Sequence, residues 1–160
     1  MSTKKVSQYL SQSHMEDRLR VFESSSATVE LAAQVLGVEP ARIAKSISLH
    51  LGEGCVIVVA AGDTKIDNAK FKTEFGEKAR MLKAEEVEPM TGYPVGGVCP
   101  FDNPPGAQVY CDVSLQRFDT VYPAGGSTDS CVKLSCNELS ELAKSKKWVD
   151  VCKGWDGAAS

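Results

Sequence analysis

One lysine stands where the sequence predicts apolar side chains. Residues 43–51 read Ile-Ala-Lys-Ser-Ile-Ser-Leu-His-Leu, an alternation that is typical of a β-strand. Side chains two residues apart share one face of a strand, so Lys45 lies on the face of Ile43, Ile47 and Leu49. An ammonium among aliphatic neighbours loses hydration unless an anion or a polar group meets it. Lys45 is therefore a candidate for binding a phosphate, a carboxylate or a polarised carbonyl. The alternatives are a lysine that extends to water or an inward charge that protects a sheet edge.

Two glycine-containing segments are further candidates for ligand binding. Residues 91–106 hold four glycines and four prolines, and the apolar residues among them favour an ordered loop over a flexible linker. Glycine lets main-chain N–H and C=O groups approach a ligand closely. The stretch Ala124-Gly125-Gly126-Ser127 is either a phosphate-binding turn or a simple hairpin turn.

The cysteines and histidines offer little nucleophilic or metal chemistry. The chain has six cysteines, none in a Cys-x-x-Cys pair, and two histidines. No histidine lies near Cys99 or Cys111 in sequence to activate a thiol, so both are interpreted as inert buried or pocket-lining thiols. Asp112 ends an apolar strand and is interpreted as a turn or capping residue. No P-loop or dinucleotide fingerprint is present, and we expect neither a metal nor a cofactor.

Length and composition predict one domain over residues 1–160. Hydrophobic residues make up 42% of the 160 residues, charged residues make up 24%, and the formal net charge is −3. This charge argues against broad coating of nucleic acid, and no DNA partner is expected. No apolar run approaches the ~18 residues of a membrane span, and none follows the charged N-terminus as in a secretory signal. We therefore expect a cytoplasmic protein with reduced thiols and no membrane partner.

A basic stretch is a candidate surface for RNA. Residues 65–83 contain six basic and three acidic side chains, a net charge of +3 within a chain of −3. This asymmetry is typical either of a face that contacts an RNA backbone or of a solvated helix face, and the count alone leaves both open.

The surrounding pattern predicts a mixed α/β or α+β domain. Helices are expected over 29–36 and 67–75, each followed by a glycine. The strand at 43–51 and the apolar run at 55–61 form a predicted hairpin, with the second strand covered on both faces. Further strands are expected at 19–21, 79–82, 108–113, 120–124 and 131–134, and further helices at 4–17, at 84–90 and from the cap Asn137 to about Lys146. Because several strands are joined by hairpins, the sheet is not expected to be a doubly wound parallel one.

In their order and spacing, six segments resemble the YbaK/prolyl-tRNA synthetase-associated editing domain family. These segments are Thr28 to Val38, Ile43 to Ile47, Gly62 to Asp67, Thr91 to Phe101, Val109 to Asp112 and Ala124-Gly125. The resemblance covers about residues 20 to 145, which we expect to be the core of the domain. It implies a mixed, partly closed β-sheet flanked by helices.

The resemblance also implies a function, that of a trans-editing aminoacyl-tRNA deacylase. Such an enzyme hydrolyses the ester of a mischarged tRNA, here most readily Cys- or Ala-tRNA for proline. Lys45 corresponds to the catalytic lysine. The implied substrate-binding residues are Gly96, Gly97, Val98, Cys99, Pro100, Phe101, Ala124 and Gly125. The acceptor 3′ end of mischarged tRNA is the expected partner, and an aminoacyl-tRNA synthetase is a further candidate. The alternative is a non-catalytic module that binds aminoacyl-tRNA or an amino acid.

An aminoacyl ester is already activated, so its hydrolysis needs few catalytic groups. Its hydrolysis needs positioning, a water molecule and stabilisation of the developing oxyanion, so a general-base side chain is not obligatory. Lys45 would hold the terminal phosphate or the aminoacyl carbonyl, and main-chain groups of Gly96 and Gly97 would hold the carbonyl or the α-amine. Phe22 and Tyr122 are further candidates for the pocket wall.

Overall fold

A mixed six-stranded sheet forms the centre of the computed structural model, which describes residues 2–21, 29–95, 97–126 and 130–154. Its strands, in spatial order, are β8 (Leu134–Ser135), β6 (Thr120–Pro123), β2 (Ile43–Leu51), β3 (Gly54–Ala61), β5 (Ala107–Asp112) and β9 (Trp148–Val149). Two antiparallel pairs flank this sheet: β1 (Leu19–Val21) with β7 (Ser130–Val132), and β4 (Lys65–Ile66) with β10 (Cys152–Lys153).

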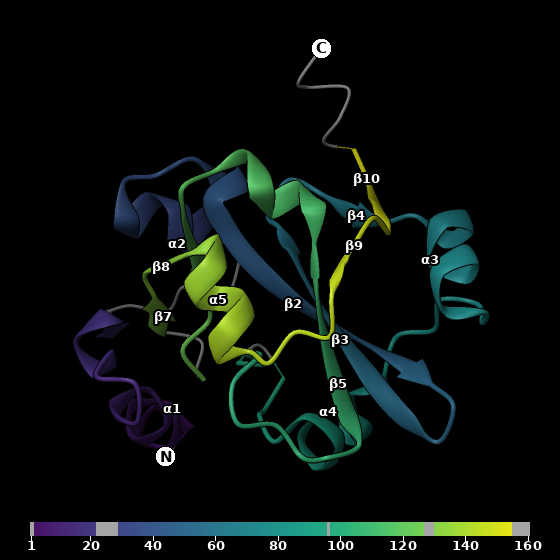
Figure 1. Ribbon diagram of the computed structural model, residues 1–160, viewed down its shortest axis with the longest axis horizontal. Helices are drawn as coiled ribbons and strands as arrows, with labels where there is room; N and C mark the ends of the chain where they lie inside the picture. The colour runs from purple at the N-terminus through teal and green to yellow at the C-terminus, as the bar shows by residue number, and fades with distance from the viewer. Residues whose placement is uncertain (1, 22–28, 96, 127–129, 155–160) are drawn as a thin grey trace.

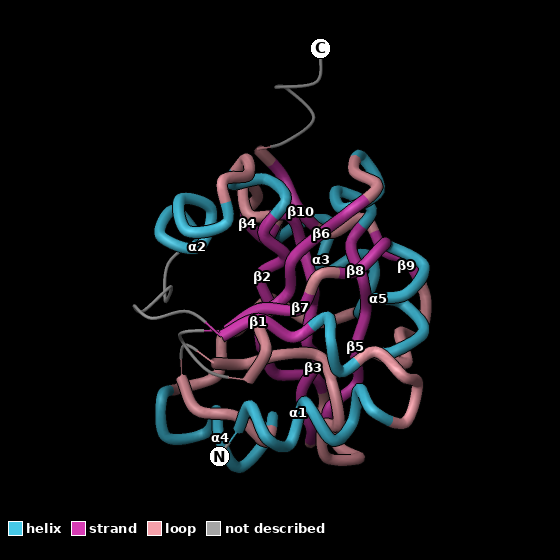
Figure 2. The backbone as a smooth tube through the Cα atoms, turned by 90° about the vertical axis from the view of Figure 1, so that its left-hand side faces the viewer, coloured by secondary structure: helices cyan, strands magenta, loops and turns pink. Residues whose placement is uncertain are grey.

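Helices lie on both sides of the sheet. They are α1 (Ser2–Ser11), α2 (Val29–Leu36), α3 (Asn68–Phe75), α4 (Ala84–Thr91) and α5 (Cys136–Leu142), with 3-10 turns η1 (Glu16–Arg18), η2 (Pro40–Arg42) and η3 (Val113–Arg117). In Figure 1, α5 lies in front of the sheet, α3 at its right-hand edge and α4 below. Figure 2 shows α2 and α5 on opposite sides of the strands. The predicted mixed, partly closed sheet flanked by helices is confirmed. Within the described residues, no helix is long and apolar enough to cross a membrane.

The apolar sequence of β3 follows from its central position. On one face of β3, the even-numbered residues 56, 58 and 60 pack in a cluster with Phe71 of α3. On the other face, the odd-numbered residues 57, 59 and 61 pack in the main cluster with Val6 of α1 and Leu139 of α5. All of these side chains are fully buried. A strand covered on both faces has no polar side, as the near-continuous apolar run predicts.

Buried side chains extend beyond residues 20–145. Val6 and Leu10 of α1 are fully buried in the main hydrophobic cluster. Val151 and Cys152 are fully buried in a second cluster, on the α3 side of the sheet. The segments on both sides of the expected core therefore help to support the sheet.

The last helix does not begin where the sequence suggested. The predicted cap Asn137 lies inside α5, and Ser135 is the N-cap instead. The Ser135 hydroxyl accepts from the Glu138 N–H at 3.1 Å, while the Glu138 carboxylate accepts from the Ser135 N–H at 2.9 Å. This reciprocal capping satisfies two N–H groups at once, which a cap at Asn137 would not do. The helix ends at Leu142, before the expected Lys146.

The hairpin at the centre of the sheet is confirmed, and one edge of it is partly open. Strands β2 and β3 pair in antiparallel fashion from Ala44 opposite Ala61 to Leu51 opposite Gly54. On its other edge, β2 pairs with the parallel strand β6 only at Ile43 and Ala44. The predicted strand at 79–82 is wrong, since within this segment only Met81 forms an isolated bridge, to Leu49. Between these two contacts, the edge of β2 faces a cavity.

Candidate functional site

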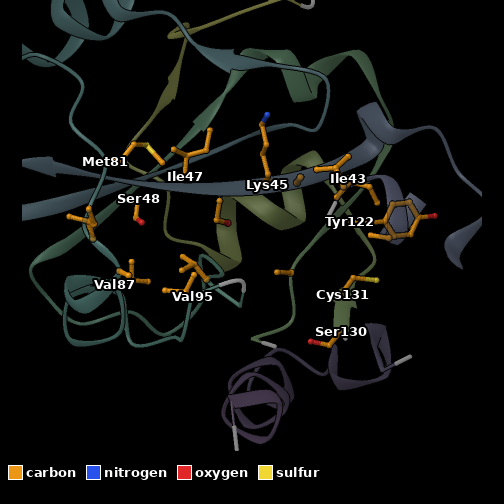
Figure 3. Close-up of a pocket in the computed structure, with 18 residues that line it drawn as sticks. Ile43, Lys45, Ile47, Ser48, Met81, Val87, Val95, Tyr122, Ser130 and Cys131 are labelled. Carbon is orange, nitrogen blue, oxygen red and sulfur yellow. The ribbon is translucent and has the colours of Figure 1, made fainter. Parts of the chain in front are cut away.

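A cavity of about 540 Å³ lies along the open edge of β2 (Figure 3). Sites for small molecules commonly enclose ~300–1,000 Å³. The wall is mainly apolar and comes from α2, β2, the segment that leads into α4, the loop after α4 and the strands β6 and β7. Tyr122 and Met81 stand on the wall at either end of the open edge, and Ser48, Ser130 and Cys131 add polar atoms.

Lys45 reaches this cavity from one face of β2. The predicted alternation is confirmed for Ile47 and Leu49, which pack in the cluster on the α3 side, whereas Ala44 packs in the main cluster. Ile43, at the start of the strand, packs in a third cluster against α2. The Lys45 amine donates a hydrogen bond to the carbonyl of Thr64. Burial lowers the pKa of Lys45 below the ordinary value for lysine.

The Lys45 amine has no ion-pair partner among the described residues. Asp63 is close enough to raise its pKa, but that carboxylate is held by Arg117 at 2.6 Å. A half-buried ammonium whose hydrogen-bond partner in the described part of the chain is a neutral carbonyl retains the capacity to bind an anionic group of a ligand.

Lys45 and the glycine-rich loop lie on opposite sides of β2. In Figure 3 the Lys45 side chain points away from Val95, which marks the loop. The amine therefore does not face the loop directly, although the resemblance implies that Lys45 and the loop both bind the substrate. Lys45 and the loop residues Val95 and Val98 nevertheless line the same cavity.

The loop after α4 contributes apolar side chains to the cavity wall. Val95 and Val98 line the cavity, and Val95 is 61% exposed. The N–H of Gly97 donates to the Pro94 carbonyl at 2.9 Å, so that group already has a partner within the loop. Gly96 lies outside the described residues.

The next three residues of the loop are buried behind the wall. Cys99 and Phe101 are fully buried in the main cluster, and Pro100 is buried between them. Tyr93 donates its hydroxyl to the Phe101 carbonyl, and Asn103 donates to the Cys99 carbonyl at 3.0 Å. Burial raises the pKa of Cys99 to about 12, so the thiol is neutral at physiological pH. These residues shape the loop, and their direct contact with a substrate stays a prediction.

Ala124 lines the cavity, whereas Gly125 packs behind it. A Cβ atom on Gly125 would lie 2.6 Å from Leu19 Cδ1 and 2.9 Å from Ser130 Oγ. The Gly125 N–H donates to the Ser130 carbonyl at 3.2 Å. Close packing against β1 and β7 therefore explains this glycine without a phosphate, and Ser127 of the same turn lies outside the described residues.

Two further sequence predictions bear on the site. Tyr122 is on the cavity wall as expected, and Phe22 lies outside the described residues. In the basic stretch, Lys70 pairs with Asp150 at 3.1 Å, while Lys65, Lys72, Lys78, Arg80 and Lys83 are exposed. Whether this surface contacts RNA stays a prediction. In the described part of the chain, no three His, Cys, Asp or Glu side chains gather to hold a metal ion.

The sequence analysis missed Ser46, which also lines the cavity. Its hydroxyl oxygen is buried and is the one such side-chain atom in the described residues that lacks a hydrogen-bond partner. Alternation places Ser46 on the face opposite Lys45, where a serine among other polar residues gives no sequence signal of a binding site.

Comparison with known proteins identifies the domain. A family model described as the aminoacyl-tRNA editing domain matches residues 23–142. This chain belongs to the aminoacyl-tRNA editing domain family. The resemblance drawn from the sequence is thereby confirmed.

Individual relatives of this editing domain agree with the family model. The chain is 52% identical to the protein YwhH of Bacillus subtilis over 158 residues, which cover 98% of this chain and 100% of that protein. It is 36% identical to the proline–tRNA ligase of Thermotoga maritima over 127 residues, 78% of this chain but 21% of the ligase. A solved structure described as a proposed trans-editing enzyme for prolyl tRNA synthetase matches with a TM-score of 0.87 and 26% identity, over 96% of this chain and 98% of that one.

Proposed function

We propose that this editing domain hydrolyses the ester of mischarged tRNA for proline, with alanine or cysteine as the attached amino acid. The observation that carries the proposal is the cavity of about 540 Å³ at the open edge of β2, whose lining includes the half-buried residue Lys45. The likeness to a proline–tRNA ligase and to a proposed trans-editing enzyme supports the choice of tRNA.

Lys45 is the proposed catalytic residue, and its task is electrostatic. A phosphate of the tRNA end would replace or join the Thr64 carbonyl as the partner of the amine. A charge-assisted hydrogen bond in a partly buried site is stronger than the same bond in water. This contact would fix the terminal adenosine so that its ester lies in the cavity, where bound water attacks the activated carbonyl.

The cavity wall supports a small amino acid as the substrate. Most of the wall is aliphatic, including Val29, Val87 and Val98. Apolar walls favour small apolar side chains such as those of alanine and cysteine over charged ones. A second site of this kind adds discrimination, because one methylene is worth only ~1–3 kcal/mol in a synthetase pocket.

A prolyl-tRNA synthetase is the proposed protein partner. The net charge of −3 limits long-range attraction to tRNA. A synthetase that delivers the mischarged tRNA would compensate for weak binding, and translation would place both proteins in the cytoplasm.

A panel of mischarged tRNAs tests the proposal. tRNA for proline carrying alanine, cysteine or serine is incubated with excess protein, and ester loss is followed against spontaneous hydrolysis. We expect the alanine or cysteine ester to be lost faster with the protein present, while correctly charged prolyl-tRNA persists. Binding of mischarged tRNA without ester loss would instead support a non-catalytic binding module and refute the proposed reaction.

A further inference from the structure

Among the described residues, the partners of the β2 edge leave a gap of one residue position at the cavity. The N–H of His50 donates to the Arg80 carbonyl at 2.8 Å, and the Ser48 carbonyl accepts from the Leu82 N–H at 3.2 Å. On the same edge, β6 pairs no further than Ala44. Main-chain groups of alternate residues in a strand point to the same edge. The N–H and C=O of Ser46 therefore point between these two contacts, toward the cavity.

The side chain of Ser46 adds a third unused polar group at this place. Its buried oxygen has no partner among the described residues. Buried polar groups in native proteins are nearly always paired, because an unpaired one costs ~1–3 kcal/mol. Ser46 lines the cavity, and its unpaired hydroxyl beside an open strand edge is explained if a ligand completes the hydrogen bonds of this residue.

We propose that the α-aminoacyl group of the substrate pairs with Ser46 as one residue of an antiparallel strand would. The α-ammonium donates to the Ser46 carbonyl, and the ester carbonyl oxygen accepts from the Ser46 N–H. The Ser46 hydroxyl donates a second hydrogen bond to the same carbonyl oxygen of the ester. This inference rests on the proposed function and specifies how the site would hold the part of the substrate shared by all α-amino acids.

The chemistry of an α-aminoacyl ester fits this edge. It carries a nitrogen donor and a carbonyl acceptor on either side of one carbon, as a residue in a strand does. Two residues that face each other in an antiparallel ladder can exchange both hydrogen bonds in this way, and peptides bind open sheet edges by the same groups. Two hydrogen-bond donors to the carbonyl oxygen of the ester would also stabilise the oxyanion that forms on this atom during hydrolysis.

The first test separates stability from binding with one substitution. Ser46→Ala removes a hydroxyl that has no partner among the described residues, so the melting temperature should stay equal or rise. The same variant should bind 3′-alanylamido-3′-deoxyadenosine, a non-hydrolysable analogue, about tenfold more weakly, as expected for one lost hydrogen bond. Ser46→Thr, which keeps a hydroxyl, should lose less affinity.

Ser114→Ala is the matched control. The Ser114 hydroxyl oxygen accepts from the Ala61 N–H at 3.1 Å, and the residue is fully buried away from the cavity wall. Its removal should lower the melting temperature and leave the affinity for the analogue unchanged at a temperature where the protein is folded. Equal affinity of Ser46→Ala and the wild-type protein would overturn the role of the hydroxyl.

The second test removes the amine from the ligand. 3′-Propionylamido-3′-deoxyadenosine lacks the α-ammonium and should bind at least about tenfold more weakly than the alanyl compound, as loss of a charge-assisted bond predicts. Equal binding of the two compounds would overturn the pairing. Binding that depends on both Ser46 and the amine, without ester loss from any mischarged tRNA, would support the pairing and refute the deacylase function.

Discussion

Replacing Lys45 by methionine separates the proposed role of its charge from its role in packing. Methionine keeps an unbranched apolar stem of similar length, so packing by the stem of this side chain is largely retained. The amine donates a hydrogen bond to the Thr64 carbonyl, and burial lowers its pKa. Because this bond is offset by desolvation of the charge, we expect the free energy of unfolding to change by no more than ~1 kcal/mol.

The expected loss of activity is much larger. A charge-assisted hydrogen bond between the amine and the substrate contributes ~1.5–3 kcal/mol, which corresponds to a loss of about 10- to 150-fold in kcat/KM. Single-turnover deacylation of alanyl-tRNA for proline measures the loss, and urea unfolding of the same preparation measures stability. Lys45→Arg, which keeps the charge, is the control and should lose less than Lys45→Met. Turnover of folded Lys45→Met at the wild-type rate would refute the reasoning.

Three further predictions test the site and its support. Burial lowers the pKa of Lys45, so its amine loses its charge at a lower pH than an ordinary lysine does. The acceleration over spontaneous hydrolysis should therefore fall as the pH rises through that lowered pKa. A pH profile that stays flat up to the ordinary pKa of lysine would contradict this. Asp112 is fully buried and accepts from two main-chain N–H groups at 2.9 and 3.0 Å, so Asp112→Asn should lower the free energy of unfolding by ~1–3 kcal/mol in urea titrations, and an unchanged midpoint would count against it. A Cβ on Gly62 would lie 2.2 Å from the Pro40 carbonyl oxygen, so Gly62→Ala should cost ~1–3 kcal/mol in the same assay, whereas wild-type stability would mean that the contact relaxes freely.

Local sequence rules predicted the central hairpin and several helix ends well. The helices α2 and α3 are followed directly by Gly37 and Gly76, whose φ angles of 71° and 78° are left-handed, as glycine after a helix predicts. Alternation in β2 placed Lys45 on the correct face, and the apolar run of β3 predicted cover on both faces. These features depend on neighbours within a few residues, which the sequence displays directly.

Features set by distant segments could not be predicted in this way. The gap at Ser46 exists because β6 pairs with β2 no further than Ala44, while the segment that contains Met81 pairs with β2 only from Ser48 onward. The sequence of β2 predicts neither of these limits. The burial of Cys99 depends on how the loop after α4 packs against the main cluster. Glycines in such loops admit ligand binding and close packing equally well, and only the structure separates the two at Gly125.

The central claim is tested most directly by ester loss from alanyl-tRNA for proline. This loss is measured in single turnover with excess wild-type protein, with the Lys45→Met variant and with a protein-free control. The account predicts rapid loss with the wild-type protein, loss slowed by at least about tenfold with the variant, and intact prolyl-tRNA throughout. Decay of the alanyl and cysteinyl esters at the protein-free rate, with the wild-type protein folded, would contradict it.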